Sequence, residues 1–326
     1  MTPPLASRTD AIVDEWGSRL FNVSAPTAPR TQAGGARRGA HPHAGTGGRL
    51  RTPEARAQFV RQKLPAMVRR APQVMVKLAR APKGMRGISN NLSYISRDGQ
   101  LDLEDQDGQI ITGKEAVRDL KQEWQQGGFP IAAQSTMRDA FHLILSMPTR
   151  TDPLSVQRAA REFATREFSN HQYVMVLHTF ETDPDPHPAR HPHVHLTVKT
   201  AGLDGTRLNP RKPDLQRWRE VFVEALREQG IEATTTSRLH RTTQERWTVR
   251  HLADKATQAT RVDRRTRATQ APRVQLDLMQ NYERVMKALA RSDRGEDRQL
   301  AADLVRYLTG RSRMREEEKA RPQERE

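Results

Sequence analysis

The chain contains no cysteine, only four tyrosines and no long apolar run. Without cysteine there can be no disulfide, no thiolate metal ligand and no cysteine nucleophile, which fits a reducing compartment. No stretch approaches the ~20 apolar residues that a membrane-spanning helix needs, and the N-terminus lacks the apolar segment of a signal peptide. These absences favour a cytoplasmic protein with no membrane insertion.

The charge balance is strongly basic. The 326 residues include 55 Lys and Arg against 39 Asp and Glu, which gives a net charge of +16. A surplus this large indicates a polyanionic partner, most often nucleic acid. Only 35% of the residues are hydrophobic and 29% are charged, so part of the chain is expected to lie outside any packed core.

Composition divides the chain into three expected parts. Residues 1 to about 50 are rich in Ala, Gly, Pro, Thr and Arg, and residues 53–70 have a helical pattern, so residues 1–70 are predicted to form a basic extension that is largely disordered or partly helical. Residues 71–245 carry the strongest apolar patterns and form the expected folded domain. Residues 246–326 predict a charged helical extension that ends in a charge run.

Within the central part, strands and helices alternate. Apolar alternation predicts strands at 73–80, 141–146, 173–178 and around 193–195, and helical periodicity predicts helices at 88–98, 116–126, 154–168 and 215–230. Long helices between strands, with one hairpin, favour an α+β fold with a central, mostly antiparallel sheet flanked by helices.

Three histidines form a candidate metal site. His193 and His195 are two residues apart on a predicted strand, so their imidazoles face the same side. His178 ends the preceding predicted strand and lies opposite them if the two strands pair as a hairpin. Three convergent imidazoles can bind a metal. The alternative is that they are loop or rim residues of a basic protein.

Tyr94 is the candidate nucleophile. On the predicted helix the apolar stripe is Ile88, Leu92 and Ile95, and Tyr94 falls well away from it, beside Arg97. Tyr173 fits a core or rim position, and Tyr282 and Tyr307, at apolar spacing on predicted C-terminal helices, fit core positions. A metal site on a basic protein suggests phosphodiester chemistry, for which water, serine, threonine or tyrosine could attack. From the helix alone, an ordinary amphipathic surface tyrosine is the simpler interpretation.

Three ordered motifs resemble those of the tyrosine relaxases, the DNA-strand transferases of conjugative and mobilisable plasmids, and are closest to the MOBP branch. The first is Asn91-Leu-Ser-Tyr-Ile-Ser-Arg-Asp-Gly99, the second is His142-Leu-Ile-Leu-Ser-Met-Pro148, and the third is His178 together with His191-Pro-His-Val-His-Leu-Thr-Val-Lys199. The stretch from Leu208 to Ile231 resembles the end of that domain. The resemblance covers about residues 73–245.

The resemblance implies the relaxase variant of the HUH nuclease fold. It implies that Tyr94 is the nucleophile and that His178, His193 and His195 hold a divalent metal, typically Mg²⁺ or Mn²⁺. The expected activity is strand-specific nicking at a plasmid transfer origin through a covalent 5′-phosphotyrosyl intermediate, which initiates conjugative transfer. Candidate DNA contacts are Asn91, Arg97, Ser146, Lys199 and Arg211.

The third motif departs from the family pattern, in which an aspartate often stands two residues after the first histidine. Here His178 is followed by Thr179 and Phe180, so Glu181, Asp183 or Asp185 is left to orient a metal ligand. The connection to His193 is also longer than usual. It adds His187 and His191 as further candidates for the metal shell, and His191 or a carboxylate of this loop as the proton acceptor.

The expected partners are single-stranded or melted transfer-origin DNA, relaxosome accessory proteins and a type IV secretion coupling protein. Three rival functions stay open. One is a rolling-circle replication initiator or transposase of the same superfamily. Another is a non-enzymatic DNA-binding accessory protein with structural histidines. The third is a metal-dependent nuclease that uses water.

Overall fold

The computed structural model describes residues 5–21, 52–236 and 280–320. Contacts divide them into two units, one formed by residues 72–235 and the other by the described residues on either side of it. Each unit has its own hydrophobic core. Within these ranges no helix combines the length and apolar character that crossing a bilayer requires. Residues 22–51, which belong to the extension expected to be largely disordered or partly helical, lie outside the described residues.

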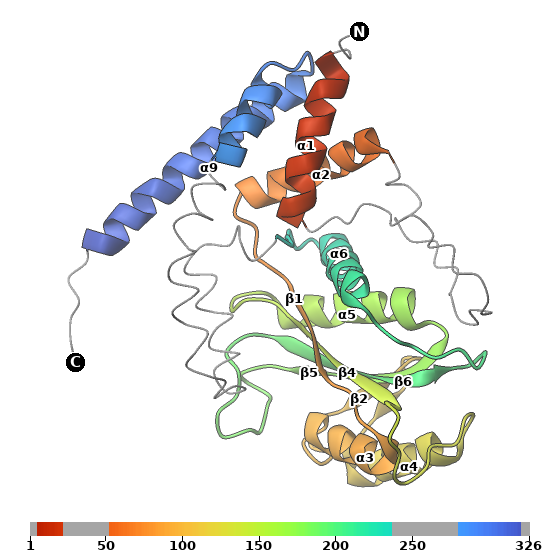
Figure 1. The fold of residues 1–326 in the computed structure, drawn as a ribbon. Coiled ribbons are helices and arrows are strands. Elements are labelled where there is room, and N and C mark those ends of the chain that lie inside the picture. The colour runs from red at the N-terminus through yellow and green to blue at the C-terminus, as the bar shows by residue number, and fades with distance from the viewer. Residues whose placement is uncertain (1–4, 22–51, 237–279, 321–326) are drawn as a thin grey trace, which may run out of the picture. The chain divides into compact units, whose positions relative to one another are not determined.

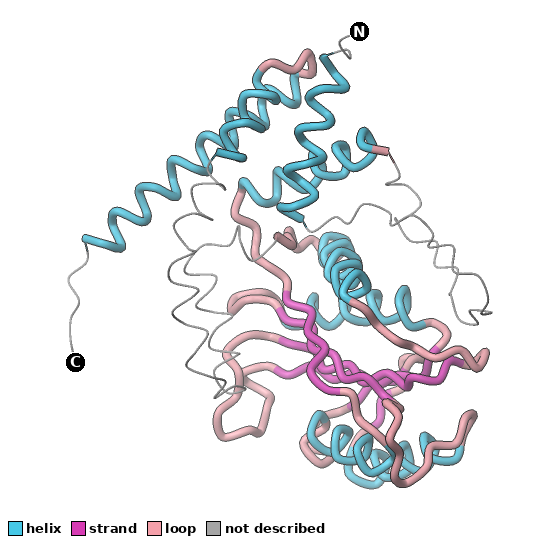
Figure 2. Tube along the Cα trace, in the orientation of Figure 1, coloured by secondary structure: helices cyan, strands magenta, loops and turns pink. Residues whose placement is uncertain are grey.

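A six-stranded antiparallel sheet organises residues 72–235, which confirms the predicted α+β class (Figure 1, Figure 2). The strand order is β1-β4-β6-β5-β2-β3, so β1 and β3 are the edges. The strands are β1 (Met75–Arg80), β2 (Leu103–Asp105), β3 (Ile110–Ile111), β4 (Ala140–Ser146), β5 (His171–His178) and β6 (His193–Gly202).

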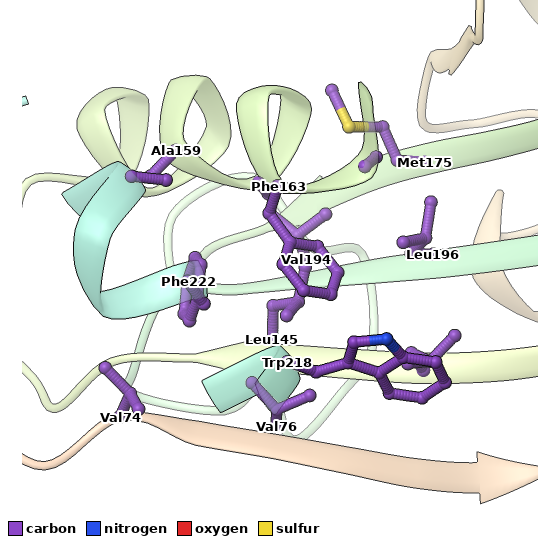
Figure 3. Packing of buried hydrophobic residues seen from close by; sticks show 14 of the residues in the cluster. Val74, Val76, Leu145, Ala159, Phe163, Met175, Val194, Leu196, Trp218 and Phe222 are labelled. Carbon is purple, nitrogen blue, oxygen red and sulfur yellow. The ribbon is translucent and has the colours of Figure 1, made fainter. Parts of the chain in front are cut away.

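One face of the sheet packs on α5 (Pro153–Phe168) and α6 (Lys212–Glu228). Both helices have Pro in the first turn, where its missing N–H costs nothing. Phe163, Phe222 and Trp218 interdigitate with inward-facing strand residues such as Val194 and Leu196 (Figure 3). This closely packed layer fixes β4, β5 and β6, and therefore the opposite face that carries the histidines.

That opposite face packs on α3 (Gly84–Ile95) and α4 (Gly113–Gln126). Met85, Ile88 and Leu92 of α3 are buried against Val174 and Val176 of β5, with α4 adding Trp124. The predicted apolar stripe of α3 is confirmed as its buried side. The helix ends at Ile95, three residues earlier than expected, because Arg97, Asp98 and Gly99 all adopt positive φ.

The other unit consists of helices from both ends of the chain. They are α1 (Leu5–Phe21), α2 (Pro53–Val68), a helix over residues 280–290, and α9 (Gly295–Ala320). Their shared core includes Trp16, Leu64 and Leu304, together with Tyr282 and Tyr307, which confirms the predicted core position of both tyrosines. The two extensions expected from composition thus share one core.

A candidate metal and nucleophile site

The β5–β6 hairpin brings the three histidines together. His178 is paired with His193 across the hairpin, and His195 is paired with Val176, so all three side chains stand on the α3 face. All three are buried. Each offers a nitrogen atom, and these nitrogens lie within 4.8 Å of one another. The three imidazoles therefore converge, as the strand pattern predicts.

Burial keeps these imidazoles neutral at physiological pH. Desolvation lowers the pKa of His193 to about 4 and places that of His195 well below its ordinary value. The pKa of His178 is also lowered, again chiefly by burial, although Ile95 and Asp183 oppose the shift. A neutral imidazole keeps the lone pair that a metal ligand must donate, so the donor set suits a divalent cation.

Asp183 is the carboxylate that orients His178. Its Oδ2 lies 2.8 Å from Nδ1 of His178, and Arg97 binds the same carboxylate through two N–H···O bonds of 2.8 and 2.9 Å. Burial alone would raise the pKa of Asp183, but these bonds and one from the Asp185 backbone outweigh it and hold the pKa well below its usual range. The ionised carboxylate fixes the His178 proton on Nδ1.

The remaining nitrogen of His178 faces an acceptor. Its Nε2 lies 2.7 Å from the backbone carbonyl oxygen of Ile95, the last residue of α3. A neutral ring carries one proton and cannot satisfy both Asp183 and this carbonyl. A cation on Nε2 would accept the lone pair that faces the carbonyl oxygen, provided that the ring or the Ile95 carbonyl shifts, because a metal bound about 2 Å from Nε2 does not fit within the 2.7 Å contact. The residues present therefore fit a bound divalent metal.

A chain of buried polar groups leads away from His195. Its Nδ1 lies 2.7 Å from Nε2 of His142, whose Nδ1 lies 3.0 Å from Nδ2 of Asn91. The Thr197 hydroxyl donates to Oδ1 of Asn91 over 2.6 Å. All four side chains are buried, so the bonds they make with one another are what satisfy them. Asn91 and His142 therefore fix the orientation of the His195 ring.

Tyr94 lies beside this cluster. Its ring centroid is 5.8 Å from that of His195 and 6.4 Å from that of His142, in edge-to-face arrangements. The side chain is 46% exposed, so a substrate can reach it. Two guanidinium groups face its ring, that of Arg97 at 5.1 Å and that of Arg80 at 5.8 Å from the centroid. A phenol beside imidazoles and cations is suited to attack on a phosphate.

Three of the expected DNA contacts are enclosed within the protein. Asn91 is buried and bonded to His142 and Thr197. Ser146 is buried at the end of β4, where its Oγ lies 3.5 Å from the carbonyl oxygen of Pro192. Lys199 is 2% exposed and donates to Gln172 and to the carbonyl of Gly127. Enclosed groups of this kind are already engaged by protein partners, and a sequence motif does not show which polar residues are enclosed.

The other expected residues have mixed surroundings. Arg97 is engaged by Asp183 and Asp185, whereas Arg211 is exposed just before α6. His191 is half-buried, its ring centroid 5.3 Å from that of His193, and burial lowers its pKa. His187 is exposed. Among the described residues, neither of the last two belongs to the group that could hold a metal.

The sequence interpretation gave His142 no role and left Asp183 as one of three options. His142 and Ser146 are four apart on one strand, and His195 and Thr197 are two apart on the next. Strand alternation therefore places all four on one face, and that spacing could have identified the buried chain. Nothing in the sequence distinguishes Asp183 from its acidic neighbours.

A family model matches the segment of the chain that carries this site. Residues 94–231 match "Relaxase: MobA/VirD2-like, nuclease domain", a segment that contains Tyr94 and all three histidines. No curated protein matches the chain. One solved structure, from "Molecular Basis of Vancomycin Resistance Transfer in Staphylococcus aureus", is 15% identical with a TM-score of 0.30 and covers 51% of this chain and 99% of that chain. So distant a likeness carries no argument.

Proposed function

We propose that the chain nicks one DNA strand at a plasmid transfer origin and stays covalently joined to it, because residues 94–231 match the MobA/VirD2-like relaxase nuclease domain. The observation that carries this proposal is the position of Tyr94, whose ring lies 5.8 Å from that of His195 and whose side chain is open to solvent. A phenol placed there is within reach of a phosphodiester bound beside the histidines.

The proposed step is a transesterification. The phenolic oxygen of Tyr94 attacks phosphorus, the bond from phosphorus to the 3′ oxygen breaks, and the DNA 5′ phosphate becomes a tyrosyl ester. The phenol loses its proton to a base, and the departing 3′ oxygen gains one. The new ester keeps the energy of the broken bond, so the strand can be rejoined by the reverse reaction, which hydrolysis by water would not allow.

The roles of the other residues follow from their contacts. His178, His193 and His195 would hold a divalent cation, proposed as Mg²⁺ or Mn²⁺, which supplies positive charge against the scissile phosphate. Asp183 and Arg97 keep the His178 ring in place. His191 is the proposed proton acceptor, because its half-buried ring lies beside the metal-site histidines, with its centroid 5.3 Å from that of His193.

The proposal also includes the substrate, the partner proteins and the compartment. The substrate is transfer-origin DNA that is single-stranded or melted, because a phenol on a helix needs an accessible backbone phosphate. Relaxosome accessory proteins and a type IV secretion coupling protein are the proposed partners, and the cytoplasm is the proposed compartment. The net charge of +16 supports a nucleic-acid substrate.

The test is to trap the covalent product. The purified chain is incubated with Mn²⁺ and a library of single-stranded oligonucleotides, and the attached DNA is found on a denaturing gel and sequenced. We expect a phosphotyrosyl peptide containing Tyr94 in the mass spectrum and no adduct with Tyr94→Phe. Tyr173→Phe is the control, because Tyr173 is buried in the sheet and its hydroxyl makes a long, 3.5 Å contact with Thr165.

Two results would contradict the proposal. If Tyr94→Phe still formed the adduct, another residue would be the nucleophile. If Tyr94→Phe cut DNA as well as the wild type and neither left an adduct, the chain would be a hydrolytic nuclease that uses water.

A further inference from the structure

The edge strand β1 carries two cations on the same face as the histidines. In the sheet register Lys77 is opposite Ile144, which is opposite His195, and Arg80 is opposite His142, which is opposite Thr197. Directly paired residues point to the same side of a sheet. Lys77 and Arg80 are exposed. They therefore extend the row of imidazoles toward the open edge of the sheet.

A β-bulge places Arg80 on this face. Leu78 is opposite Leu143, and the next residue of β4, His142, is opposite Arg80 rather than Ala79. In a regular strand, Ala79 would stand beside His142 and Arg80 would point to the other side. Bulges at sheet edges commonly redirect one side chain next to an active site. Here the redirected group is a guanidinium 5.8 Å from the centre of the Tyr94 ring.

Neither cation is neutralised by an ion pair within the described residues. In the part of the chain that the structure describes, neither Lys77 nor Arg80 has an ion-pair partner, whereas Arg97, the other guanidinium near the Tyr94 ring, is bound to Asp183. Both also act electrostatically on His142, where they contribute to its lowered pKa. An unpaired cation beside a reactive phenol is available to an anion that arrives from solution.

We propose that Lys77 and Arg80 form a phosphate-binding site along β1, which holds the single-stranded DNA backbone beside Tyr94. This inference rests on the proposed function and names the residues that bind its substrate. Two cations on adjacent same-face positions of a strand can bind successive phosphates. They replace the enclosed groups Asn91, Ser146 and Lys199 that the motifs had suggested.

The test is equilibrium binding of a short fluorescein-labelled oligothymidylate, measured by anisotropy at several salt concentrations in EDTA, so that no cleavage occurs. We expect Lys77→Gln/Arg80→Gln to weaken binding roughly tenfold and to reduce the slope of log Kd against log salt by about 0.7 for each phosphate that is no longer neutralised. The charge-conserving pair Lys77→Arg/Arg80→Lys should retain the wild-type slope.

Lys212→Gln/Arg227→Gln is the matched control. It removes the same two charges from exposed positions of α6, which covers the opposite face of the sheet. The inference is overturned if the β1 pair binds DNA as the wild type does, if its affinity falls with an unchanged salt slope, or if the α6 pair weakens binding as much. The adduct assay tests the role of Tyr94 separately, so the phosphate-binding site and the proposed function can each be refuted without the other.

Discussion

The direction of one hydrogen-bond chain decides whether His195 can bind a metal. As the amide of Asn91 is placed, its Nδ2 donates to Nδ1 of His142, so His142 carries its proton on Nε2 and donates to Nδ1 of His195. A neutral His195 then has its own proton on Nε2. A metal on that nitrogen requires the reverse direction, with Nδ1 of His195 as donor and Oδ1 of a rotated Asn91 as the final acceptor.

His142 is therefore expected to control metal affinity. In His142→Phe, the Nδ1 proton of His195 loses its acceptor and the ring loses its fixed orientation. We expect the affinity for Mn²⁺ to fall about 10- to 100-fold, as measured by isothermal titration calorimetry. His171→Phe is the control, because His171 is also buried on the same sheet but bonds to the carbonyl of Lys199. Equal losses in the two variants would refute a specific role for His142.

At the scale of single residues, the sequence predicted which side chains meet at the site better than it predicted which of them are exposed. His178, His193 and His195 could be identified because alternation on a strand is a strong geometric constraint. The motif suggested DNA contacts at Asn91 and Lys199, yet both bond within the protein. Whether a polar side chain meets solvent or a partner depends on residues far away in the chain, such as His142 for Asn91 and Gln172 for Lys199.

At the scale of elements, the end of α3 determines where Tyr94 and Arg97 stand. Arg97, Asp98 and Gly99 have φ values of 50°, 56° and 86°, a left-handed turn that stops the helix. A Cβ at Gly99 would lie 2.5 Å from the backbone nitrogen of Lys114 at the start of α4. The turn is thus held between two helices and directs Arg97 back toward Asp183.

Gly99→Ala should reveal how tightly this turn is held. We expect it to destabilise the chain by about 3 kcal/mol in urea unfolding, because the methyl group meets backbone that cannot move aside. Gly113→Ala is a matched control, since Gly113 also has φ of 86° but open space around its Cβ position. Its destabilisation should be only about 1 kcal/mol, the cost of the left-handed backbone itself. Similar values for both variants would show that α4 does not confine the turn.

Long elements were predictable and short ones were not. Most long strands and helices of residues 72–235 were expected within a few residues of their observed ends, because each repeats a periodic apolar pattern, but β6 was expected only around residues 193–195 and continues to Gly202. The β2–β3 hairpin, Leu103–Asp105 with Ile110–Ile111, was missed. Its strands are three and two residues long, too short to show alternation. The bulge of β1 was missed for a related reason, since it depends on the pairing with β4.

At the scale of the whole molecule, the two ends of the chain share one core. From composition, residues 1–70 and 246–326 were predicted as separate extensions. A local sequence pattern carries no information about contacts between segments that are far apart in the chain. In the structure Arg61 of α2 binds Asp10 of α1 and Asp297 of α9, the last through N–H···O bonds of 2.6 and 3.0 Å. These groups are buried or nearly so, and burial of an unpaired charge is costly.

Asp297→Ala tests this junction. The change leaves Arg61 with one of its two carboxylates, and we expect the unfolding free energy of the helical unit to fall by about 3 kcal/mol. Hydrogen exchange of peptides from α1 and α2 should accelerate, although the substitution lies in α9, because all three helices are joined through Arg61. Asp303→Ala is the control on the same helix. Asp303 pairs with the exposed Arg306, so its removal should cost under about 1 kcal/mol. Faster exchange limited to α9, or equal effects of the two substitutions, would mean that Arg61 does not join the helices from the two ends of the chain.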